Sequence, residues 1–397
     1  MNTAELSKIQ SLIQKMNIDG WLLYDFRASN VLALEILGIP TTSHLTRRFF
    51  YYIPATGTPV KIVNGIEADN LRHLPGQELK YGSHSSLEAH LRRVLFPGST
   101  IAMEYSPNDA IPYLSKLDAG MFEFLKTFQV NIICSGDLIT LFNAVWTEQQ
   151  YQENIPVAQE LTKIVRRAFA LIKEKIQSNT DVNEYEVQQF IMAEFDRCGF
   201  ITDYPPIVGV NENGANPHYE PTKEVHKPIH KGDFVLIDLW AKQNKPEGVW
   251  ADITWVGYVG TEIPEKYVKI FSIVKEARDA GLALVTDRFA AGKEVRGYEV
   301  DNAVRNVITQ AGYGDYFIHR TGHSITTEVH GSGPHMDNFE TFDDRRIFPS
   351  TSFSIEPGIY LPGDFGVRLE IDVFIHPDGK VEFTGDEKQE EIIAILA

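Results

Sequence analysis

The sequence predicts two domains, an α/β domain over residues 1–145 followed by an α+β domain over residues 146–397. The length of 397 residues exceeds that of a usual single domain. Before Trp146, short apolar runs alternate with helical patterns, which is typical of an α/β domain. After Trp146, two long helices precede a group of strands, and this order occurs twice.

The first domain begins with an amphipathic helix over residues 4–16, because its apolar residues recur at helical spacing. Short apolar runs then predict strands over residues 21–24, 48–53, 60–63, 101–104 and 130–134. A helix over residues 87–96 ends at Pro97 and Gly98. No histidine of this domain has the spacing of a metal ligand, so we expect no catalytic residue in it.

The second domain opens with a capping-box pattern at Thr147 and Gln150, which predicts a helix that extends to about residue 177. Pro156 means that this helix either begins near Asn154 or is kinked at the proline. The further helices are expected over residues 184–198, 264–288 and 297–312. The expected strands are 206–210, 234–240, 249–259, 352–356, 367–375 and 381–384, with a loop over 331–350. The polar turn 242–248 predicts that the second and third of these strands form a hairpin.

Charge and cysteine content narrow the class of protein. With 37 basic and 54 acidic residues the formal net charge is -17, which argues against binding to nucleic acid or to an anionic membrane surface. Cys134 and Cys198 are the only cysteines, so no disulfide framework is expected. Neither a signal-peptide pattern nor a membrane-spanning apolar run is present. We therefore expect a soluble cytoplasmic protein.

Three carboxylates lie in sequence that should be buried. Asp238 is in Val-Leu-Ile-Asp-Leu-Trp, Asp252 in Trp-Ala-Asp-Ile-Thr-Trp, and Glu370 in Val-Arg-Leu-Glu-Ile-Asp. A buried carboxylate without a partner costs several kcal/mol or stays protonated. One such residue could lie on a partly exposed strand, but several together indicate a shared cation.

A histidine-rich stretch, residues 319–330, adds the imidazole of His323, and Glu356 adds a fourth carboxylate. One imidazole and four carboxylates form an oxygen-rich set without thiolates, which suits manganese, iron, cobalt or zinc. Five ligands exceed the need of one catalytic metal, whereas two ions about 3.5–4 Å apart would use them all. A water bridging two such ions becomes a hydroxide near neutral pH and can attack a carbonyl carbon.

The order of these ligands resembles that of the pita-bread metallopeptidases, which include methionine aminopeptidase, prolidase and aminopeptidase P. The matching motifs are Gly322-His323, Glu356-Pro357-Gly358 and Arg368-x-Glu370. They lie within residues 147–390, and the first domain is similar to that of prolidase, aminopeptidase P and creatinase in general plan only. The resemblance implies a creatinase-type N-terminal α/β domain followed by an α+β pita-bread catalytic domain.

The resemblance also implies roles for the ligands. Asp252 and Glu370 would bridge two metal ions, Asp238 would hold one of them, and His323 with Glu356 would hold the other. Glu356 would in addition carry the proton from the attacking water to the leaving nitrogen.

Further residues match positions of the family that face the substrate or support the metals. His218, His319 and His330 match substrate-facing histidines, which would bind the scissile carbonyl or the substrate carboxylate. Arg368 would support the metal carboxylates from behind. Tyr360 matches a tyrosine position but also fits simple core packing.

The chain departs from the family at several points. Asp238 and Asp252 are further apart than usual, and the extra residues fall in the turn 242–248. Gly331 follows His330 where an acidic residue is common, and Ile371 replaces a frequent aspartate, with Asp372 next. His335 is an additional histidine. These changes concern substrate specificity more than metal binding.

We interpret the sequence as that of a dinuclear, metal-dependent Xaa-Pro peptidase, acting on proline dipeptides or peptide N-termini. Manganese is the favoured ion, with cobalt, zinc and iron as alternatives, and a homodimer is expected by analogy. Two other classes share the fold: a small-molecule hydrolase or lyase of the creatinase or ectoine-hydrolase type, and a non-catalytic peptide-binding module. The intact ligand set favours the peptidase.

Overall fold

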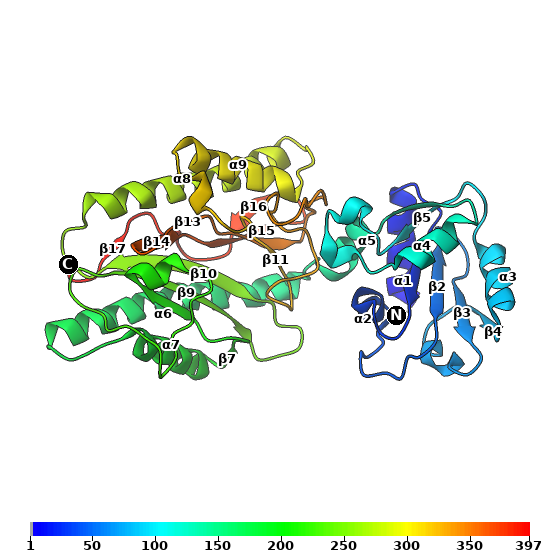
Figure 1. Ribbon diagram of the computed structural model, residues 1–397, viewed down its shortest axis with the longest axis horizontal. Helices are drawn as coiled ribbons and strands as arrows, with labels where there is room; N and C mark the ends of the chain where they lie inside the picture. Colours follow the sequence, from blue (N-terminus) through cyan, green and yellow to red (C-terminus); the bar gives the residue numbers. More distant parts are fainter. Residues whose placement is uncertain (1–2) are drawn as a thin grey trace. The chain divides into compact units, whose positions relative to one another are not determined.

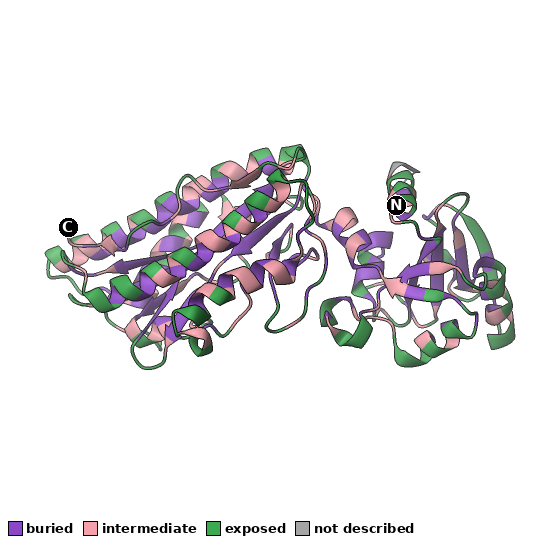
Figure 2. Cartoon of the chain, turned by 90° about the horizontal axis from the view of Figure 1, so that it is seen from above, coloured by how far each residue is buried: buried purple, intermediate pink, exposed green. Residues whose placement is uncertain are grey.

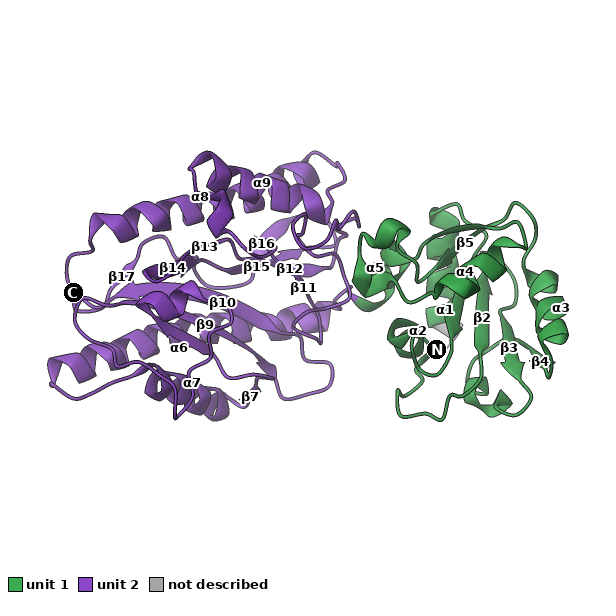
Figure 3. Ribbon diagram, viewed as in Figure 1, with its two compact units in different colours: residues 1–143 green, residues 144–397 purple. Residues whose placement is uncertain are grey.

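The structure is a computed structural model that describes residues 3–397. The chain forms two compact units, the first ending at Asn143 and the second comprising Ala144–Ala397 (Figure 3). We refer to them as unit 1 and unit 2. Within the described residues, no helix is both long and apolar enough to cross a membrane.

Unit 1 is built around a six-stranded sheet with the strand order β4-β3-β2-β1-β5-β6. β2 runs antiparallel to both its neighbours, and the other five strands share one direction. The elements are α1 Thr3–Lys15, β1 Gly20–Asp25, α2 Val31–Leu37, β2 Phe49–Pro54, β3 Val60–Asn64, β4 Gln77–Tyr81, α3 His84–Val94, β5 Thr100–Met103, α4 Ala119–Lys126, β6 Asn131–Cys134 and α5 Gly136–Asn143.

Helices cover both faces of this sheet. Residues of α1, α2 and α5 pack with Trp21 and Leu23 of β1, whereas residues of α3 and α4 pack with Leu22 and Tyr24 on the opposite face. A strand that is buried on both faces has a continuous apolar sequence instead of an alternating one. This explains the uninterrupted apolar run of β1, and Figure 2 shows the strands as buried ribbons.

Unit 2 contains two sheets and a short hairpin. The larger sheet has the order β17-β10-β9-β7, with β8 also paired to β9, and the second has the order β11-β12-β15-β16. β13 and β14 form the hairpin. The elements are α6 Glu148–Gln177, α7 Glu184–Cys198, β7 Phe200–Ile201, β8 Ile207–Val210, β9 Phe234–Gln243, β10 Ala251–Tyr258, α8 Glu265–Ala290, α9 Gly297–Gln310, β11 Ser324–Ile325, β12 Ser352–Ile355, β13 Gly358–Leu361, β14 Phe365–Arg368, β15 Ile371–Ile375, β16 Val381–Phe383 and β17 Ile393–Ala394.

Each sheet of unit 2 is backed by its own helix pair. α6 and α7 pack against β9 and β10, while α8 and α9 pack against β12, β14 and β15. In Figure 1 the strands lie between the two helix pairs. The repeated order of helices and strands in the sequence therefore corresponds to two structural halves.

Two details of the predicted secondary structure were wrong, namely the alternative that the first helix of unit 2 begins near Asn154 and the undivided strand over 367–375. α6 begins at Glu148, with Thr147 as N-cap, and continues through Pro156. Its long buried stripe outweighs the ~3 kcal/mol that an interior proline costs. The single strand expected over 367–375 is divided into β14 and β15, so that Glu370 lies between two strands, and Glu356 likewise follows the end of β12.

Candidate metal centre

The hairpin of β9 and β10 places Asp238 and Asp252 on one face. Asp238 lies opposite Thr254, and Asp252 lies opposite Trp240. The two aspartates are therefore diagonal neighbours on the same side of the sheet, within reach of each other. Their side chains are both buried. The long turn between β9 and β10 does not disturb the pairing of these two strands.

A close backbone contact holds His323 beside Glu356. The amide of Ser354 donates to the carbonyl of His323 at 2.9 Å, and the amide of Glu356 donates to the carbonyl of Thr321 at 2.8 Å. A Cβ atom on Gly322 would lie 1.9 Å from the carbonyl oxygen of Ser354. Glycine before His323 is therefore required by the closeness of the two segments.

Glu370 is held against β10, in the other half of unit 2. Its amide donates to the carbonyl of Thr254 at 3.3 Å, and the Thr254 hydroxyl donates to its Oε2 at 2.8 Å. Two residues later, Asp372 accepts a hydrogen bond of 2.7 Å from the amide of Asp252. The break between β14 and β15 thus aims Glu370 at the hairpin that carries the two aspartates.

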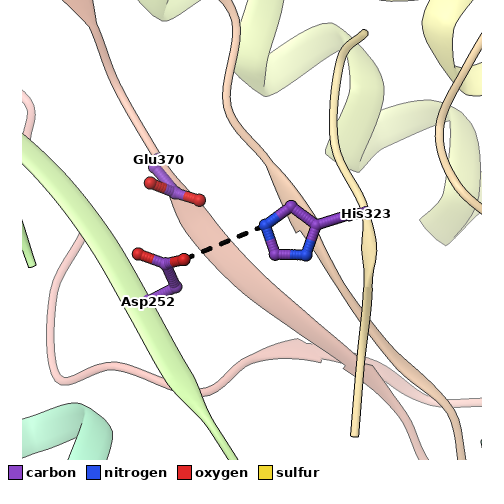
Figure 4. A group of neighbouring side chains, drawn as sticks. All are labelled: Asp252, His323 and Glu370. Atoms are coloured by element: carbon purple, nitrogen blue, oxygen red, sulfur yellow. Dashed lines mark ion pairs between the residues drawn. The ribbon is translucent and has the colours of Figure 1, made fainter. Parts of the chain in front are cut away.

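These segments bring a metal-ligand set together. Asp252, His323 and Glu370 each offer one ligand atom, and these atoms lie within 4.8 Å of one another (Figure 4). Nε2 of His323 is 3.8 Å from Oδ2 of Asp252 and 3.5 Å from Oε1 of Glu356. The four side chains come from β10 and three segments of the second half.

Burial and mutual repulsion shift the pKa values of these groups. Burial, followed by the charges of neighbouring carboxylates, raises the pKa values of Asp252 and Glu370 well above their usual range. Burial raises the pKa of Glu356 to about 7. Burial also lowers the pKa of His323 well below its usual value, so its imidazole is neutral and has a lone pair to offer.

Arg368 connects the carboxylates to their surroundings. Its Nη2 donates to Oδ2 of Asp238, its Nε to Oγ1 of Thr254 at 3.1 Å, and its Nη1 to the hydroxyl of Tyr360 at 3.0 Å. Although burial opposes its charge, the surrounding Tyr360 and acids hold the pKa of Arg368 above its usual value. The forked guanidinium fixes three partners at once, which a lysine could not do.

The chemistry of the donor set fits two divalent cations. Oδ1 of Asp238 and Oδ1 of Asp252 are buried and have no hydrogen-bond partner among the described residues. The burial of such atoms costs free energy unless a hydrogen-bond donor or a cation binds them. Asp238, Asp252, Glu356, Glu370 and Asp372 contribute five negative charges when ionised, and Arg368 contributes one positive charge, so the sum is -4. Two divalent ions would neutralise this sum.

Asp372 was not predicted as part of the cluster. Its side chain is buried, its Oδ1 has no partner, and burial raises its pKa well above the usual range. The sequence held a signal for it, because residues two apart on a strand face the same side and Glu370 was already a candidate. The strand expected over 367–375 contains both residues, so the sequence alone supported Asp372 as a neighbour of Glu370.

The predicted substrate-facing histidines differ in their environments. The ring of His330 contacts that of His323 edge to face, with centroids 4.5 Å apart, and burial lowers its pKa to about 4. Nε2 of His319 is 2.8 Å from the hydroxyl of Tyr360, and its Nδ1 is 2.7 Å from the carbonyl of Arg320. Both ring nitrogens of His319 are thus engaged within the chain, whereas His218 is exposed.

A buried glutamate organises the loop that carries His218. Glu184, at the start of α7, is fully buried and accepts hydrogen bonds from the amides of Val210 and Lys227 and from the side chains of Asn213 and Tyr219. Arg368 binds the same loop, because its Nη1 is 3.4 Å from the carbonyl oxygen of Pro217. The position of His218 therefore depends on two buried charged residues.

His335, the additional histidine, has hydrogen bonds that give it a structural role. It is buried, and its Nδ1 accepts a hydrogen bond of 3.2 Å from the amide of Ser324, the residue after His323. Its own amide donates to Asp343 at 2.8 Å. It thus supports the segment that carries His323.

Comparison with known proteins assigns the chain to a family. Residues 153–377 match the family described as metallopeptidase family M24, and the chain belongs to this family. An Xaa-Pro dipeptidase of Lactobacillus helveticus is 35% identical over 212 residues, which are 53% of this chain and 51% of that protein. An Xaa-Pro dipeptidase of Lactobacillus delbrueckii is 29% identical over 260 residues, which are 66% of this chain and 65% of that protein. The matched region thus spans between about half and two thirds of these relatives.

The solved structures agree on the fold over nearly the whole chain. A recombinant prolidase from Thermococcus sibiricus has a TM-score of 0.59 at 24% identity, with 99% of each chain covered. Dipeptidase PepE from Mycobacterium ulcerans has a TM-score of 0.65 at 18% identity, with 98% of this chain and 97% of that chain covered. The predicted fold class, an α/β unit followed by an α+β pita-bread unit, is confirmed.

Proposed function

We propose that the protein is a metal-dependent peptidase that hydrolyses the peptide bond before proline in dipeptides or at peptide N-termini. The observation that carries this proposal is the convergence of Asp252, His323 and Glu370 within 4.8 Å, in a chain of a metallopeptidase family. The names of the two dipeptidase relatives support the choice of substrate. Unit 1 would be the creatinase-type N-terminal domain, and residues from about 146 onward the catalytic domain.

The proposed ligands are Asp238, Asp252, His323, Glu356 and Glu370. When bound, two divalent cations would supply a Lewis acid for the scissile carbonyl and lower the pKa of a bound water. His323 is prepared for binding because it is neutral, and Nδ1 lies 3.4 Å from the carbonyl of Ser324, which leaves Nε2 facing the acids.

Glu356 is the proposed proton carrier. Its carboxyl group would lie beside a metal-bound water, from which it can accept a proton and release it to the leaving nitrogen, as a general acid and base requires. The hydroxyl of Ser354 donates to its Oε1 at 3.2 Å and fixes the orientation of the carboxyl group. His330 and His218 would contact the substrate, and His319 would act through Tyr360 and Arg368.

We propose manganese as the preferred ion because the donor set is mainly carboxylate oxygen. We further propose that the protein is a homodimer. We also propose that it is located in the cytoplasm, because Cys134 and Cys198 form no disulfide. Light scattering coupled to size-exclusion chromatography would measure the mass of the assembly, and a monomer would contradict the dimer.

The test combines elemental analysis with hydrolysis of Xaa-Pro dipeptides and Xaa-Pro-Xaa tripeptides in added manganese or cobalt. We expect about two metal ions per chain and cleavage before proline. A Glu356→Gln variant should retain its fold, measured by circular dichroism, and lose at least about 100-fold in kcat. Protein without metal and without rescue by added ions would refute the proposal. Bound metal without cleavage of any proline peptide would refute the substrate.

A further inference from the structure

Unit 1 contains a cavity of about 1140 Å³ that the proposed peptidase reaction does not use. All its lining residues lie between Tyr24 and Phe124, within the unit drawn in green in Figure 3. The volume lies slightly above the range of about 300–1,000 Å³ found for small-molecule sites. The cavity therefore has room for a ligand of its own.

The cavity is lined by an unusual number of cations. Arg27, Arg47, Arg48 and Lys116 all line it, and none of them forms a salt bridge with a carboxylate among the described residues. This is unexpected in a chain with 54 acidic and 37 basic residues. Four cations around one cavity repel each other, and an anionic ligand would remove this repulsion.

One acid also lines the cavity, but its oxygens are used elsewhere. Asp118 accepts a hydrogen bond of 2.8 Å from the amide of Met121, as the N-cap of α4, and another of 3.3 Å from the hydroxyl of Tyr24. With four positive charges and one negative charge the lining carries a net charge of +3. The formal charge of the whole chain is -17.

Topology places the cavity where parallel sheets bind ligands. Tyr24 is the last residue but one of β1, Asn64 ends β3 and Tyr81 ends β4, and all three line it. β1 is also the strand from which the sheet extends to β2 on one side and to β5 on the other. Open α/β sheets bind ligands outside the carboxyl ends of their strands, at such a switch point.

The backbone at the mouth of the cavity is strained and held in place. Arg27 and Ala28 are consecutive residues in the left-handed region, with φ of 62° and 58°. This conformation costs roughly 1–2 kcal/mol for each residue. The buried Asp25 maintains it, because it accepts hydrogen bonds from the amides of Ala28 at 3.0 Å and Asn30 at 2.9 Å. Strain that is held this firmly is typical of ligand sites.

The lining also provides flat apolar surface. Four phenylalanine or tyrosine rings line the cavity, those of Tyr24, Phe26, Tyr81 and Phe124, and Phe26 is 42% exposed. Arginine binds phosphate and carboxylate groups through paired hydrogen bonds, and aromatic rings stack on planar ligands. More than one anionic group is needed to neutralise the lining.

We propose that unit 1 binds a polyanion that carries a planar ring, of the class of nucleoside diphosphates and triphosphates, at the carboxyl edge of its sheet. The phosphates would contact the guanidinium groups of Arg27, Arg47 and Arg48 and the ammonium group of Lys116. The ring would contact the aromatic side chains. This binding is separate from the metal centre of unit 2 and does not depend on the proposed peptidase activity.

Isothermal titration calorimetry on the full-length, metal-loaded protein tests this with ADP, inorganic phosphate and citrate as probes. We expect one saturable ADP site per chain, and weaker binding of phosphate and citrate because neither has a ring. Arg48→Gln and Lys116→Gln should each weaken ADP binding at least about tenfold, since each removes charged hydrogen bonds. The matched control is Arg93→Gln, an exposed arginine of α3 outside the cavity, which should change the affinity less than about twofold.

Circular dichroism and the melting temperature would establish that both cavity variants are folded, and either variant alone suffices for the comparison. The absence of saturable ADP binding would overturn the proposal, as would citrate binding as tightly as ADP. ADP binding that is abolished by EDTA but unchanged in Arg48→Gln and Lys116→Gln would belong to the metal centre and would equally overturn it. The proposal would also be overturned if both substitutions altered peptide hydrolysis and left ADP binding unchanged.

Discussion

Removal of divalent cations is expected to make the protein less stable as the pH rises from 5 to 8. In the metal-free protein the buried carboxylates have folded-state pKa values above their usual values. The folded state then binds more protons than the unfolded state between the two values, so the free energy of unfolding falls as the pH rises through that interval. Bound cations would compensate these charges and remove the effect.

The size of the effect follows from Glu356. Its pKa is about 7 instead of 4.5, a difference of 7 − 4.5, or about 2.5 pKa units. One pKa unit corresponds to about 1.4 kcal/mol, so this carboxyl group alone lowers the free energy of unfolding by about 3 kcal/mol between pH 4.5 and pH 7. For a unit of this size, 3 kcal/mol lowers the melting temperature by about 6–12 °C.

The assay is thermal unfolding at pH 5, 6, 7 and 8, in EDTA and in added manganese, followed by tryptophan fluorescence. Four of the five tryptophans lie in unit 2, so the signal reports on the unit that carries the metal centre. The Glu356→Gln variant, in which this position does not titrate, should lose about 3 kcal/mol of the pH dependence in EDTA. An identical pH dependence with EDTA and with manganese would refute the reasoning.

Three substitutions test the supports of the centre. Arg368→Lys keeps the charge but not the fork, and should weaken metal binding by about 10–100-fold, measured by metal titration; unchanged affinity would contradict the role given to Arg368. Glu184→Gln leaves several donors without a charged acceptor, and should lower kcat/KM for a proline peptide while the metal content is retained; a loss of metal instead would contradict a role confined to the loop of His218. Gly322→Ala should destabilise unit 2 by about 3 kcal/mol in urea unfolding, whereas Gly385→Ala, whose new Cβ atom meets nothing closer than 3.7 Å, should be nearly neutral; equal effects would contradict the close-contact argument.

The sequence alone was sufficient to predict those elements whose signals lie in neighbouring residues. Asp238 and Asp252 could be placed on one hairpin because a polar turn separates two apolar runs, and the structure pairs these strands as expected. The ligand order could be compared with a family because it does not depend on the fold. The start of α6 was available from the capping pattern of Thr147, but the effect of Pro156 was not, because it depends on packing.

What escaped prediction depends on contacts between distant segments. Glu370 was predicted as a ligand, but the hydrogen bonds that join Glu370 to Thr254 and Asp372 to Asp252 link residues more than 100 positions apart, and no local pattern records them. The contact of Nε2 of His319 depends in the same way on a distant residue, Tyr360. The cavity of unit 1 was missed because its four cations are scattered along the chain and meet only when the sheet forms.

The two halves of unit 2 each provide two of the four carboxylates proposed as metal ligands, and this arrangement has a kinetic consequence. Asp252 and Glu370 are separated by 118 residues, so a cation can bind both only after the two halves have come together. Interactions that form after the transition state slow unfolding and leave the folding rate unchanged. Divalent ions would therefore act on the lifetime of the folded protein, and a chelator would shorten that lifetime without delaying refolding.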